Sequence, residues 1–294
     1  TNSPYLLSNY NDEKIGGVGG LVYDHTGMKL QYHYSACDRY GETDFEIKKP
    51  FDEYNKPGAL KFLYLQGTNC SFRKHCLQEI GGFDEEFEYY LDEVDVCMRI
   101  IDKGYKIKPV DCAIVHHKYM KSFLRNEEKI VLHPYSTVKN RFYFAYKNNV
   151  DKKGEEIDEH VSKWYTEVIN GGKYNYSNNK MTFIEYKIYE KETLEGKKIG
   201  INRGKERPKT RILNCADKKD FLQFNTISFN YPRLKICYIS KEYPPDNFGG
   251  IGRYTYDLAT TFAKMGHDVH VITEGVEQDT VDFEEGVWVH RLVS

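Results

Sequence analysis

Hydrophobic and polar residues follow two different periods along this chain, and each period predicts its own kind of element. Apolar runs bounded by glycines predict strands at residues 14–27 and 59–67. Apolar residues at helical spacing predict a helix over residues 92–103, which Gly104 would end. The alternating stretch 105–117 predicts a pair of strands that finishes in two histidines. The first half of the chain is therefore expected to mix strands and helices.

Helical patterns separate and follow these strands. One short helix is expected to begin at Ser71, a good N-cap residue, and to stop at Gly81 and Gly82. Farther along the chain, longer helices are predicted at residues 136–149, 155–170 and 180–195.

The basic stretch 196–211 is punctuated by glycines, and we interpret it as a solvated linker. The alternative is a segment that contacts acidic lipid head groups or a lipid-linked acceptor. After Pro232 the composition changes, and a hydrophobic strand at 234–240, an amphipathic helix at 253–266 and a following strand form a β-α-β unit. A third strand is predicted at 287–292, so this part begins a parallel sheet.

Composition narrows the class of protein. A length of 294 residues suggests roughly two domains, and a net charge of −2 argues against binding to nucleic acid. The chain has no apolar run long enough to cross a membrane and no visible signal peptide. Its seven cysteines include no CxxC pair, which favours reduced thiols and a cytoplasmic protein, with contact to the inner face of the membrane as an alternative.

Acidic and aromatic residues are interleaved in one short segment, residues 83–95. Seven carboxylates lie between Asp84 and Asp95, and four aromatic rings are threaded among them. Such a mixture is typical of a pocket wall that faces a sugar or a cation, although an acidic loop before an ordinary helix would have the same residue types. The three acids in the first turn of the predicted helix would face the positive end of its dipole.

The order of motifs around this segment resembles the later half of family 2 glycosyltransferases, which have the GT-A fold. The matching residues are Gly67, Phe72-Arg73-Lys74, Gly81-Gly82-Phe83-Asp84-Glu85, Asp92-Glu93-Val94-Asp95, Arg99, Gly104-Tyr105 and His116-His117. The resemblance covers residues 1–150 and implies an inverting transfer of a sugar from a nucleotide-sugar to an acceptor hydroxyl.

The resemblance assigns roles to particular acids. The general base of the family is the second of the paired acids, which is Glu93 here, and Asp92 is the competing candidate. Gly67 and Asn69 would border the acceptor and the donor sugar. Asp84 would brace the loop or contact acceptor hydroxyls.

Asp95 and Arg99 belong to the same motif and are one helical turn apart. We count both among the residues around the substrate, and their spacing predicts a structural ion pair.

The family also uses a histidine at the end of the following strand as a metal ligand. The alternation along the strand favours His117, and His116 would point to the other side. The expected ion is Mn²⁺ or Mg²⁺, bound together with oxygen ligands. The Asp-x-Asp motif that would supply these ligands does not occur in the sequence and is expected upstream of Thr1, so the isolated chain is predicted to bind nucleotide-sugar poorly and to be inactive.

The last sixty residues are similar to the opening of family 4 glycosyltransferases, which have the GT-B fold. The match runs through the Pro-Pro and Gly-Gly-Ile-Gly loop and the Gly-His-Asp-Val that leads into the second strand. The loop glycines Gly249, Gly250 and Gly252, with the N-terminus of the following helix, are expected to bind a phosphate or sugar.

These expectations combine into one α/β organisation. Residues 1–150 form the acceptor half of a GT-A domain with a mixed sheet, residues 151–232 a charged helical linker region, and residues 233–294 the first β-α-β of a Rossmann-like GT-B domain. The predicted function is a hexosyltransferase-type enzyme with a nucleotide-sugar donor and a glycan or lipid-linked acceptor, as a fragment of a tandem enzyme. The alternative is a non-catalytic carbohydrate-binding or scaffold module.

Overall fold

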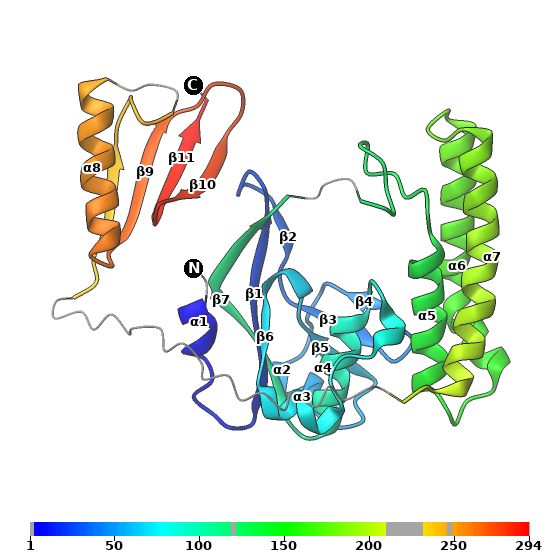
Figure 1. Ribbon diagram of the computed structural model, residues 1–294. Coiled ribbons are helices and arrows are strands. Elements are labelled where there is room, and N and C mark those ends of the chain that lie inside the picture. Colours follow the sequence, from blue (N-terminus) through cyan, green and yellow to red (C-terminus); the bar gives the residue numbers. More distant parts are fainter. Residues whose placement is uncertain (1–2, 119–121, 210–231, 246–248, 294) are drawn as a thin grey trace, which may run out of the picture. The chain divides into compact units, whose positions relative to one another are not determined.

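The computed structural model describes residues 3–118, 122–209, 232–245 and 249–293. The protein is mixed α/β, and its chain forms two compact units (Figure 1). One unit holds most of residues 3–209, and the other holds the segment 232–293 with the short stretches 23–31 and 116–118. The end of the predicted linker region, residues 210–231, and part of the predicted glycine loop, residues 246–248, lie outside the described residues.

The first unit contains a four-stranded sheet in the order β2-β1-β6, with β7 also paired to β1. Its strands are β1 (Ile15–Asp24), β2 (Leu30–Tyr32), β6 (Cys70–Phe72) and β7 (Lys106–His117). The first of these confirms the predicted glycine-rich strand, and a side chain at Gly20 would overlap the backbone carbonyl of Ala113 on β7. The predicted strand pair at 105–117 is wrong, because β7 is one strand of 12 residues and contains no glycine that could form a hairpin turn.

A second, three-stranded sheet packs beside the candidate motif region. Its antiparallel order is β4-β3-β5, and α4 packs against β5. The strand β5 confirms the strand predicted at 59–67 in a shorter form, whereas β3, β4 and α2 were not predicted. The elements are β3 (Ser35–Asp38), β4 (Thr43–Asp44), α2 (Phe51–Tyr54), β5 (Lys61–Tyr64) and α4 (Asp92–Asp102).

Short helical elements lead into α4, which confirms the helix predicted at 92–103. The helix α3 spans Lys74–Ile80, so Ser71 is not its N-cap. Ser71 lies in β6, where its hydroxyl donates to the Val18 carbonyl at 3.2 Å. Gly81 ends α3 as predicted, in the left-handed region at φ 84°, and its N–H bonds back to the last turn of the helix. The remaining short helical elements of this unit are α1 (Ser3–Leu7), η1 (Gly67–Asn69) and η2 (Glu85–Phe87).

Three longer helices of the first unit lie side by side: α5 (Tyr135–Asn148), α6 (Gly154–Ser177) and α7 (Phe183–Glu206) (Figure 1). We predicted α5 as amphipathic, but most of its residues are buried, polar ones included. The linker predicted from residue 196 onward is wrong as far as residue 206, because α7 continues through it. Gly196, Gly200 and Gly204 occur one helical turn apart and bring the α7 backbone against α5.

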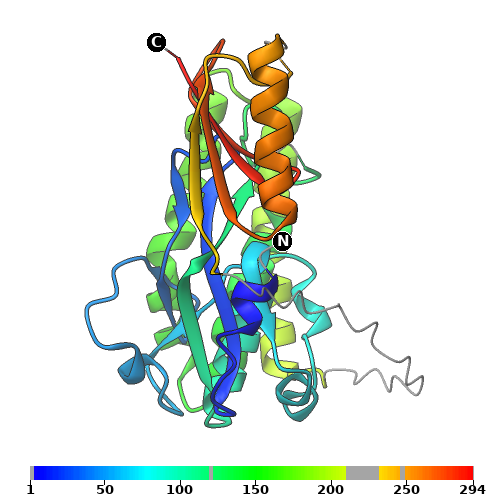
Figure 2. The ribbon, with the colours of Figure 1, turned by 90° about the vertical axis from the view of Figure 1, so that its left-hand side faces the viewer.

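The second unit is a four-stranded sheet, β10-β11-β9-β8, with α8 packed on one face (Figure 2). The predicted β8-α8-β9 unit is present, with β8 and β9 parallel, and β11 extends the parallel part of the sheet. The antiparallel neighbour β10 was not predicted. The bounds are β8 (Lys235–Ile239), α8 (Gly250–Lys264), β9 (Asp268–Glu274), β10 (Thr280–Glu284) and β11 (Val287–Leu292).

Candidate functional site

The two candidate bases open α4 in the first unit. Asp92 and Glu93 are the first two residues of the helix, and both are half-buried. The carboxyl group of Glu93 lies against η1: a methyl group built on Gly67 would be 3.7 Å from Glu93 Cδ. The fold therefore brings together predicted site residues from two separate motifs, Gly67 and Glu93.

The surroundings of Glu93 favour its protonated form. Burial raises the pKa of Glu93 to about 8, and the hydrogen bond and negative charge of Asp92 act in the same direction. Hydrogen bonds from the backbone at Glu93 and Gly67 partly oppose this change. Burial, followed by the charges of Glu93 and Asp92, also raises the pKa of the nearby Cys70 to about 12. A carboxyl group with a pKa near neutral pH is suited to accept and release a proton.

The turn before these acids is strained. Tyr90 and Leu91 have positive φ angles of 77° and 70°, which are unfavourable for residues with bulky side chains. Asn140 on α5 donates to the carbonyl oxygens of Tyr89 and Tyr90 and so stabilises the turn. The helix α5 thereby helps to set where α4 and its two acids begin.

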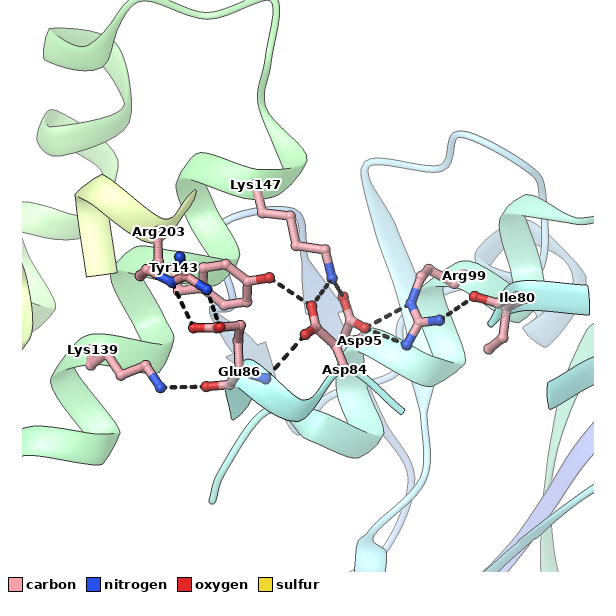
Figure 3. A network of polar contacts seen from close by, with 9 residues as sticks. All are labelled: Ile80, Asp84, Glu86, Asp95, Arg99, Lys139, Tyr143, Lys147 and Arg203. Atoms are coloured by element: carbon pink, nitrogen blue, oxygen red, sulfur yellow. Dashed lines mark hydrogen bonds and ion pairs between the residues drawn. The ribbon is translucent and has the colours of Figure 1, made fainter. Parts of the chain in front are cut away.

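A buried charge network connects the same loop to α5 (Figure 3). Lys147 on α5 donates to Asp84 Oδ2 and Asp95 Oδ1, both at 2.7 Å, and the Tyr143 hydroxyl donates to Asp84 Oδ2 at 2.7 Å. Burial by itself would raise the pKa of Asp84, but the hydrogen bonds and charge of Lys147 outweigh it and lower this pKa below its usual value. Asp84 is thus an ionised brace of the loop.

Asp95 and Arg99 form the ion pair that their spacing predicts. Arg99 Nε donates to Asp95 Oδ2 at 2.7 Å, and its Nη1 donates to the Ile80 carbonyl at 2.8 Å. Since Asp95 is 0% exposed and both its oxygens accept from cations, its geometry favours a structural role over contact with substrate. Arg99 also fixes the end of α3 to α4.

Further along the loop, Glu86 is held by two helices (Figure 3). Arg203 on α7 forms an ion pair with its carboxylate, and Lys139 on α5 donates to its backbone carbonyl. The hydrogen bond from Arg203 lowers the pKa of Glu86. Asp84 and Glu86 of the acidic loop are therefore attached to α5 and α7 by charges, while Glu85 and Glu88 are exposed.

The other predicted site residues of the first sheet have different surroundings. Asn69 is buried, and its amide donates to the carbonyls of Leu21 and Ala113, so it joins β1 to β7. His116 and His117 end β7, and His117 Nδ1 lies 3.0 Å from Gln31 Oε1. Within the part of the chain that the structure describes, no three His, Cys, Asp or Glu side chains gather to hold a metal ion.

Sequence reasoning missed the contributions of α5. Lys147, Tyr143 and Asn140 hold the loop, yet each lies at least 50 residues from its partners in the sequence and matches no motif. One signal was present, because a lysine and an asparagine within a strongly aromatic helical stretch suggest polar groups that need buried partners.

In the second unit, the predicted glycine loop leads directly into α8. Gly249 is the N-cap residue, and Gly250 and Gly252 lie in the first turn. The carboxylate of Glu242 already faces this helix end, with Glu242 Oε2 3.4 Å from the Gly252 nitrogen. A side chain at Gly249 would collide with Glu242, whereas a methyl group at Gly250 would meet no atom within 4 Å.

Comparison with known families gives a match for the C-terminal part of the chain. Residues 248–294 match the family model Glycosyltransferase Family 4. The match spans α8, β9, β10 and β11, so this part of the second unit is similar to family 4 glycosyltransferases. A comparison with curated proteins gives no match. Among the described helices, none is both long and apolar enough to cross a membrane.

Proposed function

We propose that this chain belongs to a nucleotide-sugar-dependent glycosyltransferase that transfers a sugar, with inversion, to a hydroxyl group of a glycan or lipid-linked acceptor. The observation that carries the chemistry is the Asp92–Glu93 pair beside Gly67, in which Glu93 has a pKa of about 8. The family 4 match at residues 248–294 supports the general class of reaction.

In the proposed organisation, residues 1–150 are the acceptor half of a GT-A domain and residues 233–294 begin a GT-B domain, with 151–232 between them. The mixed sheet and the α4 acids of the first unit support the first assignment. The β8-α8-β9 unit supports the second. The chain would act in the cytoplasm, with a lipid-linked acceptor at the inner face of the membrane as one substrate class.

In the proposed reaction, Glu93 takes the proton of the acceptor hydroxyl. The oxygen attacks C1 of the donor sugar, the bond from C1 to the diphosphate breaks on the opposite face, and the nucleoside diphosphate leaves with the electron pair. Asp92 supports this step by raising the proton affinity of Glu93. The network of Asp84, Asp95 and Lys147 keeps the loop before α4 in place.

A divalent cation, Mn²⁺ or Mg²⁺, remains a prediction with His117 as a ligand and His116 as the alternative. The described side chains do not complete a metal site around either histidine, and none of the steps above passes through a metal.

The two candidate bases are distinguished in the full-length protein with Glu93→Gln and Asp92→Asn. We expect Glu93→Gln to lower the transfer rate by about 10²–10⁴-fold, the usual contribution of a general base. If Glu93→Gln keeps the full rate and Asp92→Asn does not, Asp92 is the base.

The pH profile gives a second, independent readout. The rate should rise with pH as Glu93 loses its proton, with a midpoint near its pKa of about 8. The rise should move to lower pH in Asp92→Asn, because the hydrogen bond and charge of Asp92 add to the effect of burial.

A non-catalytic carbohydrate-binding or scaffold module is the second candidate function. It is favoured by the exposed rings of Phe83 and Tyr89 in the acidic loop, which could pack against a sugar without any transfer chemistry. Saccharide binding by the full-length protein without turnover of any nucleotide-sugar would support this alternative.

A further inference from the structure

A cavity of about 480 Å³ lies in the first unit, away from the Asp92–Glu93 pair in sequence. It is formed by the segment before α5, the start of α5 and the middle of α7. The volume is within the range of small-molecule sites. The lining residues are Phe123, Leu124, His133, Tyr135, Ser136, Glu192 and Glu195.

One wall of the cavity presents two carboxylates, and one of them, Glu192, is held in position. Glu192 Oε1 lies 2.8 Å from His133 Nδ1, which orients the Glu192 side chain at the start of α5. Glu195 follows one turn later on α7 and is exposed. Two carboxylates on one wall disfavour a diphosphate and favour a neutral ligand that donates hydrogen bonds.

Aromatic rings contribute to the apolar part of the cavity lining. Phe123 is 69% exposed, so a face of its ring is accessible to a ligand in the cavity. Its ring contacts that of Tyr89 edge-on, with centroids 5.9 Å apart. Carboxylates that accept hydrogen bonds beside an exposed aromatic face are complementary to a pyranose ring, which has hydroxyl groups at its edge and C–H groups on its faces.

The acidic loop links this cavity to the candidate base. Tyr89 lies in the loop just before Asp92 and Glu93, and its carbonyl accepts a hydrogen bond from Asn140 on α5. Tyr135 lines the cavity, and its pKa is raised by burial and then by the charges of Glu195, Glu88 and Glu86. The cavity wall and the loop that leads to Glu93 are thus parts of one packed region.

We propose that this cavity is a subsite for a neutral saccharide unit of the acceptor, separate from the unit whose hydroxyl reacts. Glu192 and Glu195 accept hydrogen bonds from its hydroxyl groups, and Phe123 packs against a face of its ring. This assignment rests on the proposed function, because it names the substrate region that extends from the Glu93 site.

Saturation-transfer NMR with the 294-residue chain tests the subsite without any nucleotide-sugar. The probes are the methyl glycosides of glucose, galactose, mannose, rhamnose and N-acetylglucosamine. At least one should receive saturation through its ring protons. Phe123→Ala should weaken its binding roughly 3–10-fold, the range expected for loss of an aromatic contact, and Glu195→Gln should weaken it roughly 10-fold.

Two variants outside the cavity serve as matched controls. Phe183→Ala removes another exposed phenylalanine, and Glu190→Gln removes another α7 carboxylate, so both should bind as the unaltered chain does. The subsite would be overturned if no glycoside receives saturation. It would also be overturned if the cavity variants and the control variants lose affinity equally.

A kinetic experiment separates this inference from the proposed function. In the full-length enzyme, Phe123→Ala should raise the KM for an oligosaccharide acceptor several-fold and leave the KM for the donor unchanged. Transfer with an unchanged acceptor KM would refute the subsite and leave the transferase. Glycoside binding without transfer would retain the subsite and refute the transferase.

Discussion

At the scale of single residues, Glu93 should make the stability of the first unit depend on pH. Its pKa is about 8 in the folded chain, above the value of about 4.3 for an unperturbed glutamate. Between these two pH values the folded state binds more protons than the unfolded state, so the free energy of unfolding falls as pH rises. This penalty, the loss of unfolding free energy caused by ionising Glu93, is complete above pH 8 and absent below about pH 4.

The variant Glu93→Gln cannot lose a proton and should escape this penalty. Relative to the original chain, it should be equally stable at acidic pH and increasingly more stable as pH rises toward 8. Urea unfolding followed by Trp164 fluorescence, in a Trp288→Phe background, reports on the first unit. Glu88→Gln removes an exposed carboxylate from the same loop and is the control. A stability difference that does not change with pH would contradict the assigned pKa.

The residue scale also shows how far sequence alone could go. The Asp95–Arg99 ion pair was predictable, because four residues in a helix bring two side chains together regardless of the rest of the fold. Asp92 and Glu93 were predictable as neighbours because they are adjacent in the sequence. The elevated pKa of Glu93 was not, because it arises from burial against residues that only the fold brings near.

At the scale of elements, Lys147 joins the acidic loop and α4 to α5. Lys147→Met should destabilise the first unit by about 3 kcal/mol, because it leaves buried carboxylates with fewer cationic partners. Asp84 would lose the cation that lowers its pKa, while Asp95 would keep Arg99. Lys163→Met, at an exposed position of α6, is the matched control. Chemical unfolding provides the measurement.

A double-mutant cycle isolates the Lys147–Asp84 contact. Asp84→Asn combined with Lys147→Met should cost less than the sum of the two single changes, because the second change removes a charge that the first has already left unpaired. Additive costs would show that the two side chains do not interact.

The packing of α7 on α5 gives a second prediction at this scale. A side chain at Gly200 would overlap the Lys139 carbonyl oxygen, so Gly200→Ala should destabilise the first unit by roughly 2 kcal/mol. Gly171 on α6 has no neighbouring atom within 4 Å of such a methyl group, and Gly171→Ala should stabilise by roughly 0.5–1 kcal/mol. Thermal unfolding measures both. Equal effects would mean that the glycines of α7 are not needed for close packing.

Periodicity predicted most elements but not their environment. The helix α4 was predicted nearly to its ends, since its apolar face and its terminal glycine are local features. The helical course of residues 196–206 was missed, because a stretch rich in glycine and lysine suggests a linker. Only the fold shows that these glycines allow α7 to pack closely on α5. The small strands β3 and β4 were missed because they are only four and two residues long.

At the scale of the whole molecule, the chain combines two different sheet topologies. The first unit pairs β1 with β6 antiparallel, and the second builds a parallel core from β8, β9 and β11. The local β-α-β order of the second unit was predictable from sequence, and the family 4 match covers it from α8 onward. The packing of the first unit was less predictable, because helices from residues 135–206 complete the surroundings of a motif at residues 67–99.

A tandem enzyme with two such units should carry two separable transfer activities, if the proposed function holds. In the full-length protein, Glu93→Gln should reduce one transfer by about 10²–10⁴-fold and spare the other. Gly249→Leu should do the reverse, because its side chain would displace Glu242 at the start of α8. Mass spectrometry of products, with each donor and its own acceptor supplied separately, distinguishes the two transfers. Loss of both activities in Glu93→Gln would mean that the units serve a single reaction.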